Sequence, residues 1–325
     1  MRPLLKWAGG KRQLLPVLRQ HYPSSFERYV EPFLGSGAVF FDLHGSGALE
    51  GRAALLADAN PDLIGCYLMV RDRVEAVLAE LAELDEGHAR GREAFYYEVR
   101  NERFNAQRRD HPDYTPELAA MFLYLNRTGF NGLFRLNRRG EFNVPVGRYV
   151  NPRICDPVHL RAASAALRTA GVTIELRPFA ESLAGATVGD FVYCDPPYAP
   201  LTKTACFASY TAGGFNWFDQ RALQQSVLGA MRRGAWVVLS NSCTPEIEAL
   251  YGSSEVRAAG LEVQRVPARR SINSRAHLRG AVHEIIVTPL LHDRRLADIV
   301  PRMLRARSAP PVSGSARAAT ARRRA

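Results

Sequence analysis

The residues best suited to chemistry form the tetrapeptide Asp195-Pro196-Pro197-Tyr198, directly after the short apolar run 191–194. Two prolines end a strand and fix its backbone, so the Asp195 carboxylate and the Pro196 carbonyl are expected at a strand's carboxyl end. Together they can accept both hydrogens of an exocyclic amino group, which frees the nitrogen lone pair to attack an electrophilic methyl group. Tyr198 can stack on a base extruded from its helix. The set predicts methylation of a nucleobase amine, although an isolated match could also be a capped turn with a packed tyrosine.

A second segment, Glu31–Gly37 (EPFLGSG), has the glycine spacing of a strand-to-helix turn that passes close to a ligand. It lacks the full G-x-G-x-x-G pattern, so a dinucleotide pyrophosphate site is disfavoured, and alone it could be a tight turn. Asp58 follows about 23 residues after Gly35, where an acidic side chain can accept hydrogen bonds from ribose hydroxyls. The two features together predict a nucleoside-containing cofactor.

An aromatic residue, two glycines and three cations crowd together near the N-terminus, in the segment KWAGGKR (6–12). Trp7 can pack against such a cofactor, and Lys11 can pair with a carboxylate on it. Lys6 and Arg12 could face DNA. Without the other motifs, a solvated basic turn would be the simpler interpretation.

These motifs need an α/β frame to bring them together. Apolar runs near 29–30 and 53–57, each followed by a turn and a helix signal, predict a β-α-β unit, with a helix starting at Asn60-Pro61. Strand and helix signals return after residue 157, with strands at VTIEL, DFVYCD, AWVVLSNS and VHEIIVTPL. The middle region opens with a charged amphipathic helix (71–84) and then crowds aromatic and basic residues without an obvious sheet strand.

The changes in composition along the chain predict four regions. These are a cofactor-binding part (1–70), an inserted domain (71–156), a catalytic part (157–293) and a basic tail expected to be disordered (294–325). The tail could add weak, salt-sensitive attraction to DNA or could have no task.

The composition fits a globular protein whose partner is a polyanion. Hydrophobic residues make up 46% of the 325, and 43 Lys and Arg against 32 Asp and Glu give a net charge of +11 and a pI near 9.8. Arginine usage and the basic tail could also account for this charge. The five cysteines show no ligand spacing, so neither a metal nor a disulfide framework is expected. No signal peptide or 18-residue apolar stretch is evident, which predicts a cytoplasmic protein without a membrane partner.

In order along the chain, the motifs K-W-A-G-G-K, E-P-F-L-G-S-G, L-L-A-D-A-N and D-P-P-Y resemble those of the D12 class of adenine-specific DNA methyltransferases, most closely the Dam type. The segments NRTGFNGLFR (126–135) and GEFNVPVGRY (140–149) are similar to the DNA-contacting stretch of that family. The resemblance covers about residues 3–290, and four short patterns in a fixed order are highly specific in combination.

This resemblance implies a fold, a reaction and a set of site residues. The fold is a Rossmann-like, mostly parallel seven-stranded methyltransferase sheet with an inserted small helical target-recognition domain. The reaction transfers a methyl group from S-adenosylmethionine to the 6-amino group of adenine in double-stranded DNA, with GATC as the expected target. The implied catalytic residues are Asp195, Pro196, Pro197 and Tyr198. The implied cofactor contacts are Trp7, Lys11, Glu31, Phe33, Gly35, Gly37, Asp58 and Asp195, and the implied DNA contacts are Lys6, Asn131, Leu133, Arg135, Asn143, Pro145 and Tyr149.

Arg135 is the expected base reader, because arginine makes bidentate contacts to guanine that discriminate by about 1–3 kcal/mol. Phosphate contacts are expected from four neighbouring cations, Arg127, Arg138, Arg139 and Arg148, unless these only form a solvated face. The segment 269–275 (RRSINSR) is expected near the target base. Thr128 and Leu136 stand where close relatives are expected to have aromatic residues, so the target preference could differ.

Four other functions fit the sequence less well. Cytosine carbon-5 methylation would need a nucleophilic Cys in a P-C context, whereas Cys194 precedes Asp-Pro-Pro inside a strand. Methylation of RNA or of a protein glutamine often uses Asn in place of Asp195, and the arginine-rich, aromatic middle region favours duplex DNA. A catalytically silent DNA-binding protein would have no physical need for the intact tetrapeptide. The expected enzyme associates with the nucleoid through DNA, needs no metal and shows no obligate protein partner.

Overall fold

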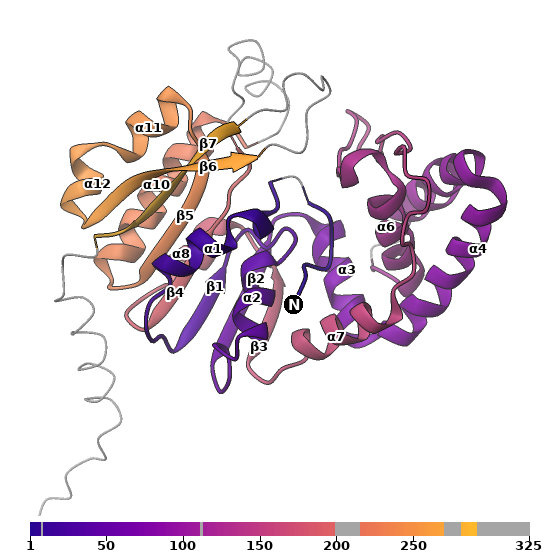
Figure 1. Ribbon diagram of the computed structural model, residues 1–325, viewed down its shortest axis with the longest axis horizontal. Helices are drawn as coiled ribbons and strands as arrows, with labels where there is room; N and C mark the ends of the chain where they lie inside the picture. Colours follow the sequence, from indigo (N-terminus) through magenta and orange to yellow (C-terminus); the bar gives the residue numbers. More distant parts are fainter. Residues whose placement is uncertain (8, 111–112, 199–214, 270–280, 291–325) are drawn as a thin grey trace, which may run out of the picture.

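A seven-stranded sheet with helices on both faces forms the larger lobe of the protein in the computed structural model (Figure 1). The structure describes residues 1–7, 9–110, 113–198, 215–269 and 281–290. The strand order is β3-β2-β1-β4-β5-β7-β6. The strands are β1 (Arg28–Glu31), β2 (Ala53–Asp58), β3 (Val172–Leu176), β4 (Asp190–Cys194), β5 (Trp236–Ser242), β6 (Leu261–Arg269) and β7 (Ala281–Pro289).

The expected mostly parallel α/β sheet is confirmed. Strands β1 to β5 pair in parallel, and β7 is antiparallel to both β5 and β6. Central strands of such sheets are covered on both faces and are apolar almost throughout, as in β4, which is buried at all five positions. Strand β1 lies between β2 and β4, so the order of the chain reverses there, and the crevice beyond the carboxyl ends at such a point is where α/β sheets bind ligands.

The strand β6 was not anticipated, and its composition explains why. Its sequence LEVQRVPAR carries polar residues and Pro267, which argue against a central strand. It lies at the edge of the sheet, where a proline costs no ladder hydrogen bond on the open side. The position in the sheet, rather than the composition, makes this segment a strand.

Two apolar clusters hold the helices on the two faces of the sheet. One joins α1 (Leu15–Leu18), α2 (Ala38–Gly45), α3 (Pro61–Asp72) and α7 (Pro157–Leu167) to the face that carries Tyr29, Tyr193 and Ile286. The other joins helices on the opposite face, namely α8 (Phe179–Ala184), α10 (Trp217–Arg232), α11 (Pro245–Tyr251) and α12 (Ser254–Ala258). Helix α3 starts where expected, because Asn60 accepts hydrogen bonds from the backbone of Asp62 and Leu63 and caps the helix.

The helices between α3 and α7 in the chain form the second lobe, at the right of Figure 1. They include α4 (Val74–Glu98), a π-helical turn (Val99–Phe104), α5 (Asn105–Asp110) and α6 (Pro116–Thr128). Helix α6 is buried from Leu118 to Thr128, and a bidentate ion pair of 2.7 Å joins Arg108 of α5 to Asp62 of α3. This lobe therefore packs firmly against the first.

The expected helix 71–84 was placed too early. Arg71 belongs to the last turn of α3, the helix is broken at Arg73 (φ −134°, ψ 35°), and α4 then extends to Glu98. No glycine or proline marks this break, so the helical pattern of the sequence continues across it and does not show where α3 ends and α4 begins.

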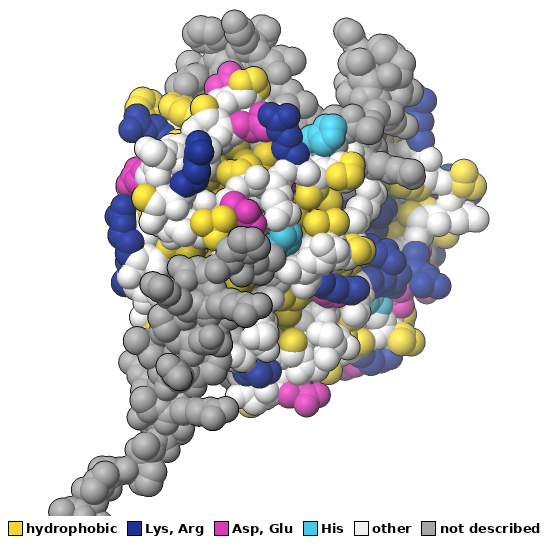
Figure 2. All heavy atoms as spheres, turned by 60° about the vertical axis from the view of Figure 1, so that its left-hand side comes forward, with side chains coloured by type: hydrophobic (Ala, Val, Ile, Leu, Met, Phe, Trp, Pro, Cys, Tyr) yellow, Lys and Arg dark blue, Asp and Glu magenta, His cyan; other side chains and the backbone are white. Residues whose placement is uncertain are grey.

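On the face drawn in Figure 2, Lys and Arg side chains are interspersed with acidic and apolar ones. In the part of the chain that the structure describes, no helix is long and apolar enough to cross a membrane.

Candidate active site and DNA-facing cleft

A cavity of about 410 Å³ opens at the carboxyl ends of β1, β2 and β4. The strands end in Glu31, Asp58 and, one residue beyond β4, Asp195, so three carboxylates line it. The structure brings together here all four expected catalytic residues and every expected cofactor contact except Gly37: Trp7, Lys11, Glu31, Phe33, Gly35, Asp58, Asp195, Pro196, Pro197 and Tyr198. The volume suits a ligand of nucleoside-amino acid size.

Asp195 is held by one partner from the N-terminal segment and one from the neighbouring strand β5. The Lys11 ammonium lies 2.8 Å from Asp195 Oδ1, and Ser240 on β5 donates to the same oxygen at 3.0 Å. Tyr193 in turn hydrogen-bonds to Ser240 at 2.9 Å. Burial raises the pKa of Asp195, whereas Lys11 lowers it, so the carboxylate keeps a neighbouring positive charge although it is withdrawn from water.

Lys11 pairs with Asp195 in the structure, and its expected pairing with a cofactor carboxylate stays a prediction. Its side chain is 2% exposed, and besides Asp195 it donates to the Gly9 carbonyl. The ammonium also lies over the Tyr198 ring, 4.6 Å from the centroid, and 3.9 Å from Glu284 Oε2. Lys11 thus ties the acidic and aromatic parts of the tetrapeptide to one another.

The turn after β1 is shaped by glycine and by Asp58. Gly35 and Gly37 have φ values of +46° and +66°, which side-chain-bearing residues rarely adopt. Asp58 Oδ2 accepts from the Gly35 backbone at 3.1 Å, and its Oδ1 accepts from Asn60 at 3.0 Å. A Cβ added to Gly35 would lie 2.9 Å from Trp7 Cδ1, so the absence of a side chain lets the indole lie on the turn.

Glu31 is the most deeply buried acid of the cavity. The residue is 2% exposed, and its Oε2 atom has no hydrogen-bond partner among the described residues. Burial raises its pKa well above the usual range, and the neighbouring carboxylates of Asp195 and Asp58 add to that effect. A buried acceptor left over in this way suits a ligand that brings a donor or a positive charge.

The N-terminal segment is clamped to the second lobe by Asn126, a role that sequence reasoning missed. Asn126 Oδ1 accepts from the Lys6 backbone at 2.9 Å, and its Nδ2 donates to the Lys6 carbonyl at 2.6 Å and to Gly132 at 3.1 Å. The Trp7 ring also stacks on Phe134, with centroids 5.9 Å apart. The lobe that carries the expected DNA contacts therefore also holds Trp7 over the cavity.

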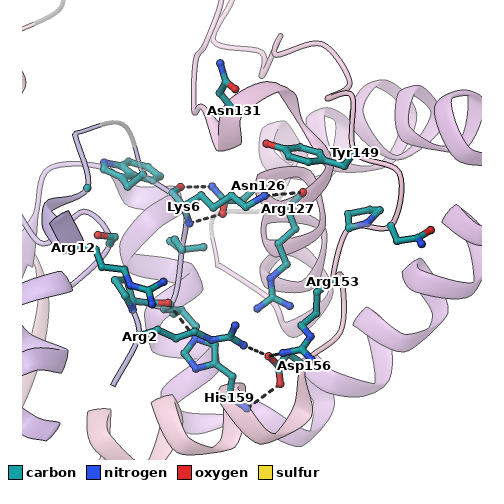
Figure 3. Close-up of a pocket in the computed structure, with 18 residues that line it drawn as sticks. Arg2, Lys6, Arg12, Asn126, Arg127, Asn131, Tyr149, Arg153, Asp156 and His159 are labelled. Carbon is teal, nitrogen blue, oxygen red and sulfur yellow. Dashed lines mark hydrogen bonds and ion pairs between the residues drawn. The ribbon is translucent and has the colours of Figure 1, made fainter. Parts of the chain in front are cut away.

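A second cavity, of about 670 Å³, adjoins the first and shares Trp7, Gly10 and Ser36 with it. Figure 3 shows Lys6, Asn131 and Tyr149 at one end and Arg2, Asp156 and His159 at the other. Five cations line it, against the single carboxylate of Asp156: Arg2, Lys6, Arg12, Arg127 and Arg153. An excess of positive charge in a hollow favours an anionic partner.

Arg127 lies inside this hollow and not on a solvated face. It is 8% exposed, it donates to the Ile154 carbonyl, and no acidic side chain pairs with it in the described part of the chain. Burial lowers its pKa to about 10, and Arg2 adds to that effect. In Figure 3 its guanidinium points toward Arg153 and Asp156, away from Tyr149.

The remaining expected DNA contacts lie on an irregular segment that follows α6. Backbone bridges pair Gly129 with Val146 and Leu136 with Phe142. Within this segment the exposed Arg135 donates to Asn143 Oδ1 at 2.7 Å. Four expected contacts do not line the cationic cavity, namely Leu133, Arg135, Asn143 and Pro145, and residues 270–275 lie outside the described part of the chain.

Glu284 on β7 is the other residue that sequence reasoning missed. Its Oε2 accepts from the Tyr198 hydroxyl at 2.5 Å, so it belongs to the same polar cluster as Asp195 and Lys11. A single charge in the apolar strand AVHEIIVTP was a signal that could have found it. No group of three or more His, Cys, Asp or Glu suited to a metal occurs among the described residues.

Comparisons with known proteins agree with this geometry. The family described as D12 class N6 adenine-specific DNA methyltransferase matches residues 7–267. The chain is 37% identical to a type II methyltransferase of Lactococcus lactis subsp. cremoris over 89% of this chain and 95% of that one. It is 36% identical to a type II methyltransferase of Methanocaldococcus jannaschii (88% and 98%) and 38% identical to a DNA adenine methylase of Escherichia coli K12 (88% and 94%).

Solved structures add only a weak likeness. An rRNA methyltransferase of Streptomyces viridochromogenes aligns over 89% of this chain and 84% of its own chain, with 14% identity and a TM-score of 0.32. The family match spans most of the chain and contains the acidic strand ends, the glycine turn and the D-P-P-Y tetrapeptide. The chain therefore belongs to the D12 class of N6 adenine-specific DNA methyltransferases.

Proposed function

We propose that this enzyme transfers a methyl group from S-adenosylmethionine to the 6-amino group of adenine in double-stranded DNA, with GATC as its target, on the DNA of the cytoplasm. The observation that carries the proposal is the cavity at the strand ends, in which Asp195, Tyr198 and two further carboxylates converge. The adjoining cationic hollow supports a nucleic-acid partner.

The cavity fits S-adenosylmethionine by its chemistry. This cofactor carries a sulfonium and an ammonium charge, which suit the carboxylates of Glu31, Asp58 and Asp195. The aromatic rings of Trp7 and Phe33 suit its adenine, and Asp58 beside the Gly35 turn suits its ribose hydroxyls. When bound, S-adenosylmethionine supplies an electrophilic methyl group.

The protein's own residues then orient and activate the amine. Asp195 and the Pro196 carbonyl accept the two amine hydrogens, so the nitrogen lone pair points into the cavity. The Tyr198 ring offers a stacking face to the extruded adenine. Positive charge develops on the nitrogen as its new bond forms, and Asp195 stabilises that charge and can accept the proton that must leave.

DNA would be held by the cationic hollow and read by the adjoining segment. Arg127, Arg2 and Arg153 can bind backbone phosphates, and in the free protein Arg2 and Arg153 pair with the carboxylate of Asp156 instead. Arg135, buttressed by Asn143, presents its guanidinium for guanine in the major groove. Asp195 thus accounts for methyl transfer, and the second lobe accounts for recognition of the target sequence.

The substitution Asp195→Ala tests the proposal directly. We expect methyl transfer from labelled S-adenosylmethionine to a GATC plasmid to fall by about 100-fold or more, whereas DNA retardation stays unchanged. Asp72→Ala, at an exposed ion pair on α3, is the control and keeps full activity. Sequencing of the methylated adenines checks the target, and methylation of RNA instead of DNA, or full activity of Asp195→Ala, would overturn the proposal.

A further inference from the structure

Glu284 brings a carboxylate to the active site from the antiparallel part of the sheet. Because β7 runs against β5, its first residues lie at the edge where the parallel strands end, and Glu284 stands opposite Ser242 of β5 and Val266 of β6. Its side chain is 15% exposed. A partly buried acid at this edge needs partners, and among the described residues these include Tyr198 of the proposed catalytic set and Lys11 of the proposed cofactor contacts.

Three side chains, Asp195, Glu284 and Tyr198, form a polar cluster around Lys11. The ammonium lies 2.8 Å from Asp195 Oδ1 and 3.9 Å from Glu284 Oε2, and it lies over the ring of Tyr198. The Tyr198 hydroxyl completes the cluster by donating to Glu284 at 2.5 Å. Glu284 therefore contacts the stacking ring directly and Asp195 through a shared cation.

We propose that Glu284 is a positioning residue for methyl transfer, which fixes the Tyr198 ring through its hydroxyl and shares the Lys11 ammonium with Asp195. The inference rests on the roles proposed above for Asp195 and Tyr198.

Charge balance gives the physical reason. Lys11, Asp195 and Glu284 together carry one net negative charge, so the cluster can stabilise the positive charge that develops on the amine nitrogen. With Lys11 and Asp195 alone, the pair would be neutral, and the ammonium would compete more strongly with the amine for the carboxylate oxygens. The hydroxyl contact adds a fixed ring plane for the extruded base.

The isosteric substitution Glu284→Gln removes the charge but keeps an acceptor for the Tyr198 hydroxyl. At saturating cofactor, we expect the single-turnover rate on a GATC duplex to fall about tenfold, with the KM for DNA within about twofold of the wild type. Glu262→Gln on the neighbouring strand β6 is the matched control, since Glu262 pairs with Gln264 and not with the site. An unchanged rate for Glu284→Gln would overturn the inference.

The pH profile separates this role from simple loss of structure. Asp195 faces Lys11, Glu284, Ser240, Glu31, Tyr193 and Tyr198. Glu284 raises the pKa of Asp195, after the larger effect of burial, so its removal lets Asp195 stay ionised at lower pH. The acidic limb of the rate profile should therefore move to lower pH in Glu284→Gln, even though the plateau falls. A limb that stays in place or moves to higher pH would contradict charge sharing.

Two further variants distinguish the role of Glu284 from the proposed function on which it rests. Tyr198→Phe keeps the ring and loses the hydroxyl. In that background Glu284→Ala should lower the single-turnover rate less than in the wild type, because the contact of Glu284 with the hydroxyl is already gone. An equal fall in rate in both backgrounds would contradict the proposal that Glu284 positions the Tyr198 ring. Asp195→Ala is measured alongside: if it stays active, the proposed function fails, and if it is inactive while Glu284→Gln is normal, only the role of Glu284 fails.

Discussion

Three carboxylates end neighbouring strands of the sheet, and burial raises the pKa of each of them. Asp58 is compensated by two backbone N–H groups and Asp195 by Lys11, but Glu31 Oε2 has no partner in the described part of the chain. A charge held in this way costs folding free energy, and it persists where a ligand needs it.

Glu31→Gln should therefore stabilise the protein at neutral pH. A carboxyl whose native pKa lies above its unfolded pKa binds its proton first in the native state, so its penalty is present above the native pKa and fades as the pH falls through it. We expect a gain of about 1–3 kcal/mol in urea unfolding at pH 8, a smaller gain at acidic pH and weaker binding of S-adenosylmethionine. Lower stability at pH 8 would show that Glu31 supports the fold.

Arg135→Ala tests base reading at a single side chain. Loss of its bidentate contact should relax the preference at one base pair by about 1–3 kcal/mol, as judged by methylation of duplexes with each substitution in GATC. The exposed Arg138 of the same segment is the control, since loss of a phosphate contact weakens all sequences alike. Preferences unchanged in Arg135→Ala would assign base reading elsewhere.

At the scale of elements, the turn between β1 and α2 connects the sheet to the cofactor cavity. Gly37 caps α2 with φ +66°, and a Cβ there would lie 3.1 Å from both Phe41 Cε2 and the Tyr67 hydroxyl oxygen. The same hydroxyl donates to the Gly35 carbonyl at 3.1 Å, so a displaced Tyr67 would disturb the lining of the cavity.

Gly37→Ala should lower both the stability and the affinity for the cofactor. The control is Gly51→Ala, which has a similar φ of +69° but open space around its added Cβ. Backbone strain should lower the free energy of unfolding of both variants by about 1 kcal/mol. Only Gly37→Ala should also raise the Kd for S-adenosylmethionine, measured by calorimetry. Equal Kd values in the two variants would mean that the turn does not shape the cavity.

At the scale of the whole molecule, the positive charge is unevenly distributed along the chain. Residues 294–325 contain nine arginines and one aspartate, a net charge of +8 out of +11. Five of the 43 Lys and Arg side chains of the chain line the hollow beside the proposed active site.

A chain ending at residue 293 should keep its target and lose general affinity for DNA. Fewer counterions are released when fewer cations bind phosphates, so the salt dependence of non-specific retardation should become less steep. The methylated sequence should stay the same as for the full chain, because base contacts are assigned to the second lobe. A changed target would give the tail a part in recognition.

Much of this protein can be predicted from local sequence. The sequence directly shows the tetrapeptide Asp195–Tyr198, the glycine turn and Asp58, because prolines, glycines and apolar runs determine the structure of neighbouring residues. The parallel sheet follows from the same local patterns, as does the start of α3 at its Asn60 cap. These features rest on interactions within a few residues, which a sequence displays directly.

The tertiary structure alone decided which distant side chains meet. The pairing of Lys11 with Asp195, the clamp of Asn126 on Lys6 and the contact of Glu284 with Tyr198 join residues more than 80 positions apart. Strand β6 likewise depends on its place at the sheet edge, and Arg127 on the hollow around it. Burial and charge compensation act through space, so their outcome depends on how the two lobes pack and not on spacing along the chain.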